Sequence, residues 1–76
     1  MLKKLILSEN EIASCEEFEG HNNLESLDLG KNKLKSFKGL SRMHSLKELT
    51  CSENEVTSLT ELTDLPNLVK LNVRQN

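Results

Sequence analysis

The residues of this chain that could take part in catalysis or metal binding are two histidines, His21 and His44, and two cysteines, Cys15 and Cys51. A histidine can act as a general acid or base and a cysteine as a nucleophile, and both can bind zinc. Each role needs further ligands or a nucleophile–base pair nearby. The sequence has no CxxC or HxxxH pair, no phosphate loop and no dinucleotide fingerprint. We therefore expect no catalysis, no metal, no cofactor and no small-molecule substrate.

The composition argues against two further classes of partner. Charged residues make up 29% of the 76 residues and the formal net charge is −2, so we expect neither nucleic acid nor an anionic membrane as a partner. Only three consecutive apolar residues follow the basic start, fewer than the roughly 7–15 of a secretory signal. There is also no Asn-x-Ser/Thr sequon and no cysteine framework. These features favour the cytoplasm.

A 22-residue repeat runs along the chain without gap or insertion. Its clearest columns are leucine at position 1 (Leu2, Leu24, Leu46, Leu68), leucine at position 4 (Leu5, Leu27, Leu49, Leu71), apolar residues at position 6 (Leu7, Leu29, Cys51, Val73) and asparagine at position 9 (Asn10, Asn32, Asn54, Asn76). Such self-similarity is the signature of a repeat architecture. We predict one domain, residues 1–76, made of repeats 2–23, 24–45 and 46–67 and a partial repeat 68–76.

Residues 24–34 read LESLDLGKNKL and resemble the leucine-rich repeat motif LxxLxLxxNxL. The tail at residues 36–43 is similar to that of the 22-residue subclass typified by a regulatory subunit of protein phosphatase 1 and also found in axonemal proteins. The resemblance covers the whole chain after Met1. It implies an α/β fold, a solenoid with a parallel concave β-sheet and short 3₁₀ or extended convex segments. The motif is specific for fold and weakly specific for function.

Alternation within residues 24–29 predicts a short strand, with Leu27 and Leu29 facing the core and Ser26, Asp28 and Gly30 facing away. One repeat cannot bury such a face alone, so stacking of repeats must supply the core.

The polar columns have structural interpretations. An asparagine amide both donates and accepts, so Asn10, Asn32, Asn54 and Asn76 can satisfy backbone groups where the chain turns away from each strand. The serines at position 13 are interpreted as turn residues whose hydroxyls bond nearby backbone (Ser14, Ser36, Ser58).

The charged positions alternate in sign from repeat to repeat. Position 2 reads Lys3, Glu25 and Lys47, whereas positions 8 and 10 follow the opposite order (Glu9 and Glu11, Lys31 and Lys33, Glu53 and Glu55). Strands of one sheet lie about 4.8 Å apart, so stacking would bring opposite charges together. We interpret the pattern as a determinant of which layer stacks on which.

The core columns also bear on the residues considered first. Cys15 and Cys51 lie two layers apart, about 10 Å by strand spacing, which is too far for a disulfide. We expect both to be free buried thiols and His21 to be a partly buried packing residue. Neither end of the chain carries a polar capping unit, so we expect these repeats to form part of a longer solenoid.

The resemblance implies that the partner is another protein and that the chain is an intracellular interaction scaffold or regulatory module. Through relatives of the same repeat class it also implies the cilium and the nucleus as narrower possibilities for the location. A ciliary structural component or phosphatase regulator is one alternative, because residues 62–68 (LTDLPNL) resemble many ciliary repeats. An extracellular adhesin of internalin type is another. The expected binding residues lie on the concave face or flank it: Lys4, Ile6, Asp28, Lys31, Glu48, Thr50, Glu53, Lys70, Asn72 and Arg74. This face has no aromatic residue, so the strongest contacts could lie outside it.

Overall fold

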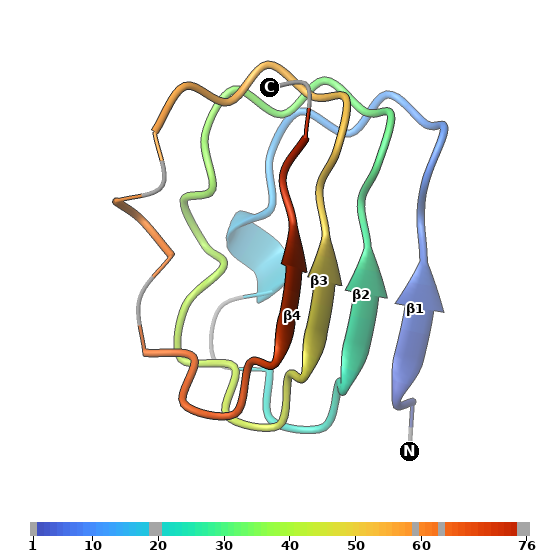
Figure 1. Cartoon of the computed structure of the whole chain (residues 1–76). Coiled ribbons are helices and arrows are strands. Elements are labelled where there is room, and N and C mark those ends of the chain that lie inside the picture. The colour runs from blue at the N-terminus through green and yellow to red at the C-terminus, as the bar shows by residue number, and fades with distance from the viewer. Residues whose placement is uncertain (1, 19–20, 59, 63, 75–76) are drawn as a thin grey trace.

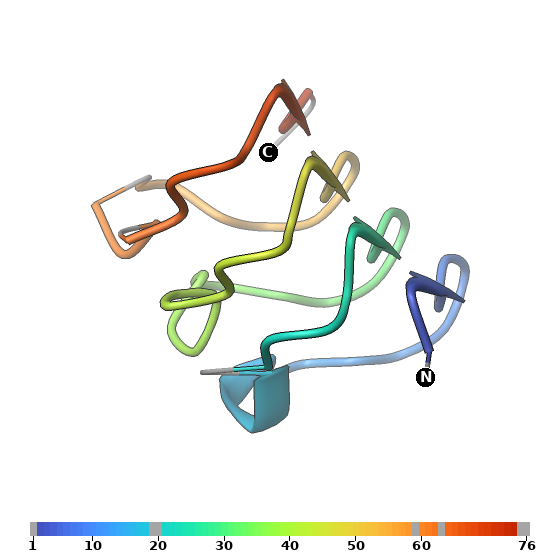
Figure 2. The same cartoon turned by 90° about the horizontal axis from the view of Figure 1, so that it is seen from below.

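The computed structural model describes residues 2–18, 21–58, 60–62 and 64–74. Four short parallel strands form one sheet in the order β1-β2-β3-β4: β1 (Lys4–Ile6), β2 (Ser26–Asp28), β3 (Glu48–Thr50) and β4 (Lys70–Asn72). One 3₁₀ helix, η1 (Glu16–Phe18), lies on the opposite side of the coil (Figure 1). Viewed along the strands, each repeat is one turn of the coil, and successive turns lie side by side (Figure 2). The predicted α/β solenoid is confirmed.

The register of the sheet follows the sequence repeat. Leu5 pairs with Leu27, Leu27 with Leu49 and Leu49 with Leu71, so every strand is offset from the next by one whole repeat. A shift of one residue would turn every leucine to the solvent face, so the apolar column fixes this register.

The core lies in the middle of the stack. Its fully buried side chains come from the strands and from the return segments: Cys15, Leu24, Leu27, Leu29, Leu34, Phe37, Leu40, Met43, Leu46, Leu49 and Cys51. The outer layers are less covered. Leu5, Leu7 and Ile12 are half-buried, and Leu71 keeps 41% of its surface exposed although Leu27 and Leu49 in the same column are at 1%. Because each layer is buried by its neighbours, most of the fully buried side chains belong to the inner layers, and Cys15 is the one from the first repeat.

The asparagine column carries hydrogen bonds both within and between layers. Asn32 Nδ2 donates to the carbonyls of Leu29 (2.9 Å), Gly30 (3.1 Å) and, in the preceding layer, Leu7 (3.0 Å). Its Oδ1 accepts the backbone N–H of Ile12 at 3.0 Å.

Asn54 repeats this arrangement one layer on, with Leu29 O (2.9 Å) and Leu34 N (3.0 Å) as its partners in the layer before. Asn10 bonds only carbonyls of its own layer, Leu7 at 2.9 Å and Ser8 at 3.1 Å. Asn76 lies outside the described residues. Both N–H groups of each inner asparagine are therefore used, one of them shared between two carbonyls, and Oδ1 accepts one backbone N–H.

The return segments differ from repeat to repeat. The first contains η1, and the second makes a turn in which Leu40 N–H bonds Phe37 O at 2.9 Å with Gly39 at φ +100°. A Cβ on Gly39 would lie 2.2 Å from Glu16 Cα and 2.4 Å from Cys15 O, so no other residue fits there without moving the first repeat's backbone.

The predicted role of the position-13 serines is confirmed. The hydroxyls of Ser14, Ser36 and Ser58 accept the N–H two residues on, at 3.3, 3.4 and 3.2 Å. These local bonds begin each return segment in the same way before the segments diverge.

Both cysteines are buried and neither forms a disulfide, as predicted. Burial raises the pKa of the Cys15 thiol to about 11, with smaller contributions from the Glu61 and Glu16 carboxylates. Burial likewise raises the pKa of Cys51 to about 12. Thiols with such pKa values are poor nucleophiles at neutral pH, because the thiolate is the reactive form.

Candidate functional site

The candidate site is the outward side of the sheet, formed by positions 3, 5 and 7 of each repeat; we call it the strand face. Its described members are Lys4, Ile6, Ser8, Ser26, Asp28, Gly30, Glu48, Thr50, Ser52, Lys70, Asn72 and Arg74. Apolar residues at positions 4 and 6 point inward and pack in the core, which turns the alternate positions outward. All the binding residues expected at positions 3, 5 and 7 therefore lie on one continuous surface.

Exposure differs along this face. Ile6 is its largest apolar side chain and is 60% exposed, whereas Asp28, Thr50 and Asn72 in the same column are half-buried. Gly30 was expected to be exposed and is buried, because Asp28 and Ser52 cover it: a Cβ there would meet Asp28 Oδ1 at 3.2 Å and Ser52 Oγ at 3.4 Å.

Two of the predicted binding residues also hold their own backbone. Asp28 Oδ1 accepts the N–H of Gly30 at 2.9 Å, and Asn72 Oδ1 accepts the N–H of Arg74 at 3.1 Å. Short polar side chains commonly form such turns two residues ahead. A partner can therefore reach the second carboxylate oxygen of Asp28 and the amide nitrogen of Asn72 without breaking these bonds.

Charge changes sign across the face. Lys4 lies on β1, Asp28 on β2, Glu48 on β3 and Lys70 on β4. Lys4, Glu48 and Lys70 are exposed and none has an ion pair within the described part of the chain. The centre of the face is thus acidic and its two edges are basic.

The flanking residues Lys31 and Glu53 adopt a backbone conformation that the sequence did not indicate. Glu9, Lys31 and Glu53, all at position 8, have φ of 59°, 56° and 58°. Each donates its N–H to a carbonyl of the next layer, for example Lys31 to Ser52 at 2.8 Å. Because glycine or asparagine usually marks this conformation, glutamate and lysine gave no signal for it.

A small polar hollow lies at the β3–β4 end of the face. Ser52, Glu53, Asn72 and Arg74 line its volume of about 160 Å³. Small-molecule sites usually measure about 300–1,000 Å³ and are mostly apolar. The hollow is of a size to take one side chain of a partner rather than a whole ligand.

The predicted alternation of charge produces ion pairs at one of its three columns. Glu25 lies between Lys3 and Lys47, with both N–O distances at 3.9 Å. No ion pair forms at positions 8 and 10 among the residues that the structure describes. These exposed pairs are each worth about 0–1 kcal/mol.

The histidines lie on the return side, away from the strand face. His44 Nε2 is 3.5 Å from Asp64 Oδ2 on the return side. His21 is half-buried and its Nδ1 is buried without a hydrogen-bond partner among the described residues. In the same part of the chain no three His, Cys, Asp or Glu side chains gather as a metal site would require, and no helix is long and apolar enough to cross a membrane.

Comparison with known proteins identifies the repeat. The family model described as Leucine Rich repeats (2 copies) matches residues 1–42, which is more than half of the chain. No curated protein and no solved structure matches the chain significantly. Repeats of this kind generally act as non-catalytic modules that bind other proteins.

Proposed function

The chain belongs to the leucine-rich repeat family, and we propose that it is an intracellular scaffold or regulatory module that binds another protein across its strand face. The observation that carries the proposal is the register of the sheet, which places the outward side chains of all four strands on one surface. Rigid sheets of stacked repeats present such extended surfaces to partners.

The charges of the face suggest the chemistry of the partner. A complementary segment would carry basic residues over Asp28 and Glu48 and acidic residues over Lys4 and Lys70. Ile6 offers the apolar contact at the β1 edge, with 60% of its surface exposed.

The proposed compartment rests on the two cysteines. Cys15 and Cys51 form no disulfide, which suits a reducing environment such as the cytoplasm. A ciliary role, regulation of a phosphatase and an adhesin-like role stay predictions from the motif resemblance.

The proposal is tested by quantitative affinity capture from a cell extract, with the chain compared against Ile6→Ser and Glu48→Lys. Both positions are exposed and neither side chain supports the core. We expect each variant to capture at most about a tenth of the amount of a specific partner that the original chain captures. A tenfold loss of affinity corresponds to about 1.4 kcal/mol of binding free energy.

A matched control is Lys38→Glu, an exposed charge reversal on the return segment of the second repeat. We expect this variant to capture the partner as the original chain does. A partner that is lost with Lys38→Glu and kept by both strand-face variants would contradict the proposed site.

A further inference from the structure

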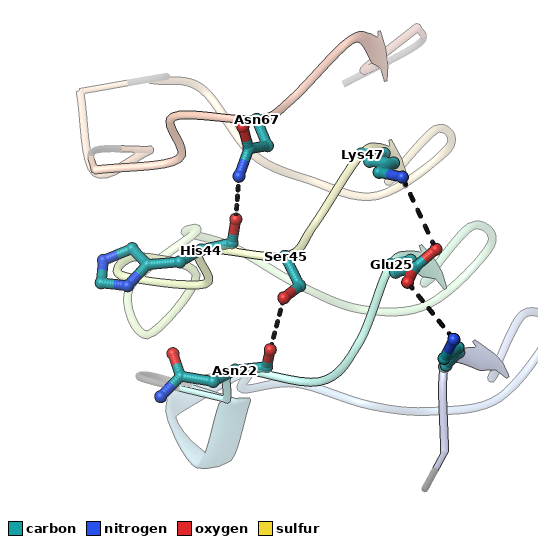
Figure 3. Close-up of polar contacts among 7 residues, drawn as sticks. Asn22, Glu25, His44, Ser45, Lys47 and Asn67 are labelled. Atoms are coloured by element: carbon teal, nitrogen blue, oxygen red, sulfur yellow. Dashed lines mark hydrogen bonds and ion pairs between the residues drawn. The ribbon is translucent and has the colours of Figure 1, made fainter.

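The alternating charges are paired within the molecule at one end of the strands. Ahead of the strands, at position 2, the Glu25 carboxylate lies 3.9 Å from the ammonium groups of both Lys3 and Lys47, in the layers on either side (Figure 3). Further back on the same side, Ser45 and Asn67 donate to carbonyls of the layer before. The polar groups that lead into the strands are therefore used to join one layer to the next.

At the other end of the strands the chain turns into the return segments (Figure 1), and the charges there form no ion pair among the residues described. In the second repeat these charges belong to Lys31, Lys33 and Lys35, which we call the lysine ridge. All three residues are exposed, whereas Asn32 and Leu34 between them are buried. A layer lies on each side of the second repeat, so the ridge belongs to an inner layer of the stack.

The backbone of the ridge is bonded to the layers on both sides. Lys33 donates its N–H to Ile12 O of the first repeat at 2.9 Å. Leu34 O accepts the N–H of Glu55 in the third repeat at 2.8 Å, and Leu34 N–H donates to Asn54 Oδ1 at 3.0 Å. Such bonds, together with alternate burial, indicate an extended backbone, in which residues two apart are separated by about 6–7 Å. The ridge therefore presents its lysines at a regular spacing from a backbone whose hydrogen bonds are already made.

Two exposed glutamate pairs flank the ridge, Glu9 and Glu11 in the first repeat and Glu53 and Glu55 in the third. Strands of adjacent layers lie about 4.8 Å apart, so the two pairs are about 10 Å apart with the lysines midway between them. One extended polypeptide fits that width. A nucleic-acid duplex or an anionic membrane would bring its charges over the glutamates as well, where like charges repel.

Position 12 of the repeat has no such flanking carboxylates. The residues there are Ala13, Lys35 and Thr57, so neither neighbouring layer offers Lys35 a charge in its own column. Because the Coulomb energy falls with distance, the positive charge of the ridge is offset least at Lys35. We therefore expect Lys35 to contribute most to the binding of an anionic group.

We propose that the lysine ridge is a second interaction surface, beyond the strand face, and that it binds an extended acidic segment of a partner protein. This segment carries a carboxylate at every second residue. Its side chains then repeat at the same interval of about 6–7 Å as the ridge, so that three carboxylates lie opposite Lys31, Lys33 and Lys35 at once. An acidic α-helix, about 10–12 Å across with its side chains, would extend over both glutamate pairs.

A second copy of this chain is a poorer match for the ridge. Its segments 9–11 and 53–55 each carry two carboxylates at alternate residues, which suit two of the three lysines. The residues two positions beyond each segment, in either direction, are uncharged, so one lysine of the ridge would face no carboxylate. Charge complementarity therefore favours a different protein with a longer acidic run.

The test measures peptide binding to the full chain, isotope-labelled for nuclear magnetic resonance. The first probe is a synthetic heptapeptide in which threonine and glutamate alternate, with three glutamates. The second probe has the same composition with its three glutamates consecutive, so that in an extended chain only two of them face the ridge. Titrations are made at about 0.01 M salt, where the screening length is about 30 Å, and at about 0.15 M, where it is about 8 Å.

We expect the alternating peptide to bind about 3- to 5-fold more tightly than the clustered peptide at low salt, which corresponds to one exposed ion pair. This difference should shrink at the higher salt concentration, because exposed charges are screened. Addition of the alternating peptide should shift the amide signals of residues 31–35 more than those of β1 to β4.

Variants that change a single charge locate the site. Lys35→Gln should weaken the binding of the alternating peptide by about 3- to 5-fold, whereas Lys35→Arg, which keeps the charge, should bind it as the original chain does. Lys47→Gln removes the same charge at the other end of the strands, where Glu25 pairs with it, and should leave the affinity unchanged. Both lysines are exposed and lie outside the core.

Equal binding of the two peptides, or equal weakening by Lys35→Gln and Lys47→Gln, would overturn the proposal, because either result means unspecific attraction of charge. Unchanged signals of residues 31–35 at millimolar peptide would overturn it as well. So would a short DNA duplex or a vesicle of anionic phospholipid that shifts these signals at a lower concentration than the alternating peptide. Self-association of the chain alone that Lys35→Gln weakens would assign the ridge to a second copy instead.

Discussion

The strand side and the return side of this solenoid are built from the same repeat but obey different constraints. On the strand side, β2 and β3 share one register, the same asparagine hydrogen bonds and the same left-handed residue at position 8. On the return side, the first repeat forms η1 whereas the second turns at Gly39. The return segments still share some bonds, such as those of Ser45 and Asn67 to the layer before. The difference shows that the geometry repeats fully along the strands and only in part along the return.

Replacing Gly39 by alanine should have the largest effect, because it adds an atom where the return side is tightest. The new Cβ would lie 2.2 Å from Glu16 Cα in a backbone with φ of +100°. We expect a loss of about 3–5 kcal/mol of unfolding free energy by urea titration. Gly30→Ala is the strand-side control, since it meets the Asp28 side chain at 3.2 Å and should lose about 1 kcal/mol. Similar losses at both glycines would remove the distinction in tightness.

High pH probes one buried thiol on each side, Cys51 beneath the sheet and Cys15 on the return. Their pKa values are raised by burial to about 12 and about 11 from 9.0. Because the unfolded thiol loses its proton first, this stability is complete below pH 9 and is lost as the pH rises through those values.

We expect each thiol to account for a loss on the order of 2 kcal/mol by pH 11, measured by urea titration from pH 8 to 11. The variants Cys15→Ala and Cys51→Ala should each flatten the decline. A decline that is unchanged in both variants would show that other groups cause it.

Replacing an asparagine of position 9 by alanine should destabilise the protein more in an inner layer than in the first layer. Asn32→Ala leaves the carbonyl of Leu7 and the N–H of Ile12 without their partner and should cost about 1–3 kcal/mol. Asn10→Ala removes only exposed bonds within one layer and should cost about half as much or less. Thermal denaturation of the two variants measures the contrast, and equal costs would mean that the contacts between layers add nothing.

On the return side, removal of one buried polar atom should increase the stability of the protein. His21 Nδ1 is buried without a partner in the described chain, whereas the same column holds Met43 and Leu65 in the next two repeats. His21→Leu should raise the unfolding free energy by about 1 kcal/mol. His44→Leu, at an exposed position paired with Asp64, should bring no gain. A loss of stability in His21→Leu would show that this column needs the imidazole.

The smallest effect concerns the ion pairs of Glu25. Glu25→Gln removes two contacts of 3.9 Å, to Lys3 and Lys47, and should cost less than about 1 kcal/mol at low salt. Glu48→Gln is the control, because its exposed carboxylate has no ion pair in the described residues. A larger effect at Glu48 would mean that net charge and not layer pairing controls stability.

The strand side was largely predictable from the sequence, because its constraints repeat. Columns of leucine at positions 1 and 4 gave the sheet, its direction and its core. The alternation of inward and outward residues gave the membership of the strand face. The prediction that Gly30 is exposed was wrong for a local reason. The position faces outward, but Asp28 and Ser52 on either side cover a residue that has no side chain of its own.

The return side was less predictable, because its tightest constraint occurs in one repeat alone. Gly39 is the only glycine of its column, and the need for it arises from the backbone of Glu16 in another repeat. The left-handed residues at position 8 were missed for a different reason. Glu9, Lys31 and Glu53 have no intrinsic preference for that conformation, and the hydrogen bonds between layers impose it.

The ladder formed by Lys3, Glu25 and Lys47 has a consequence for how such a gene can change length. Unequal recombination adds or removes whole repeats. Because the 22-residue frame has no gap, every such product keeps the columns of apolar residues that form the core. Loss of the second repeat alone would set Lys3 beside Lys47 and Glu9 beside Glu53. Duplication of two consecutive repeats among the first three keeps opposite signs adjacent. Charge parity therefore makes the pair of repeats, and not the single repeat, the unit that can be gained without placing like charges side by side.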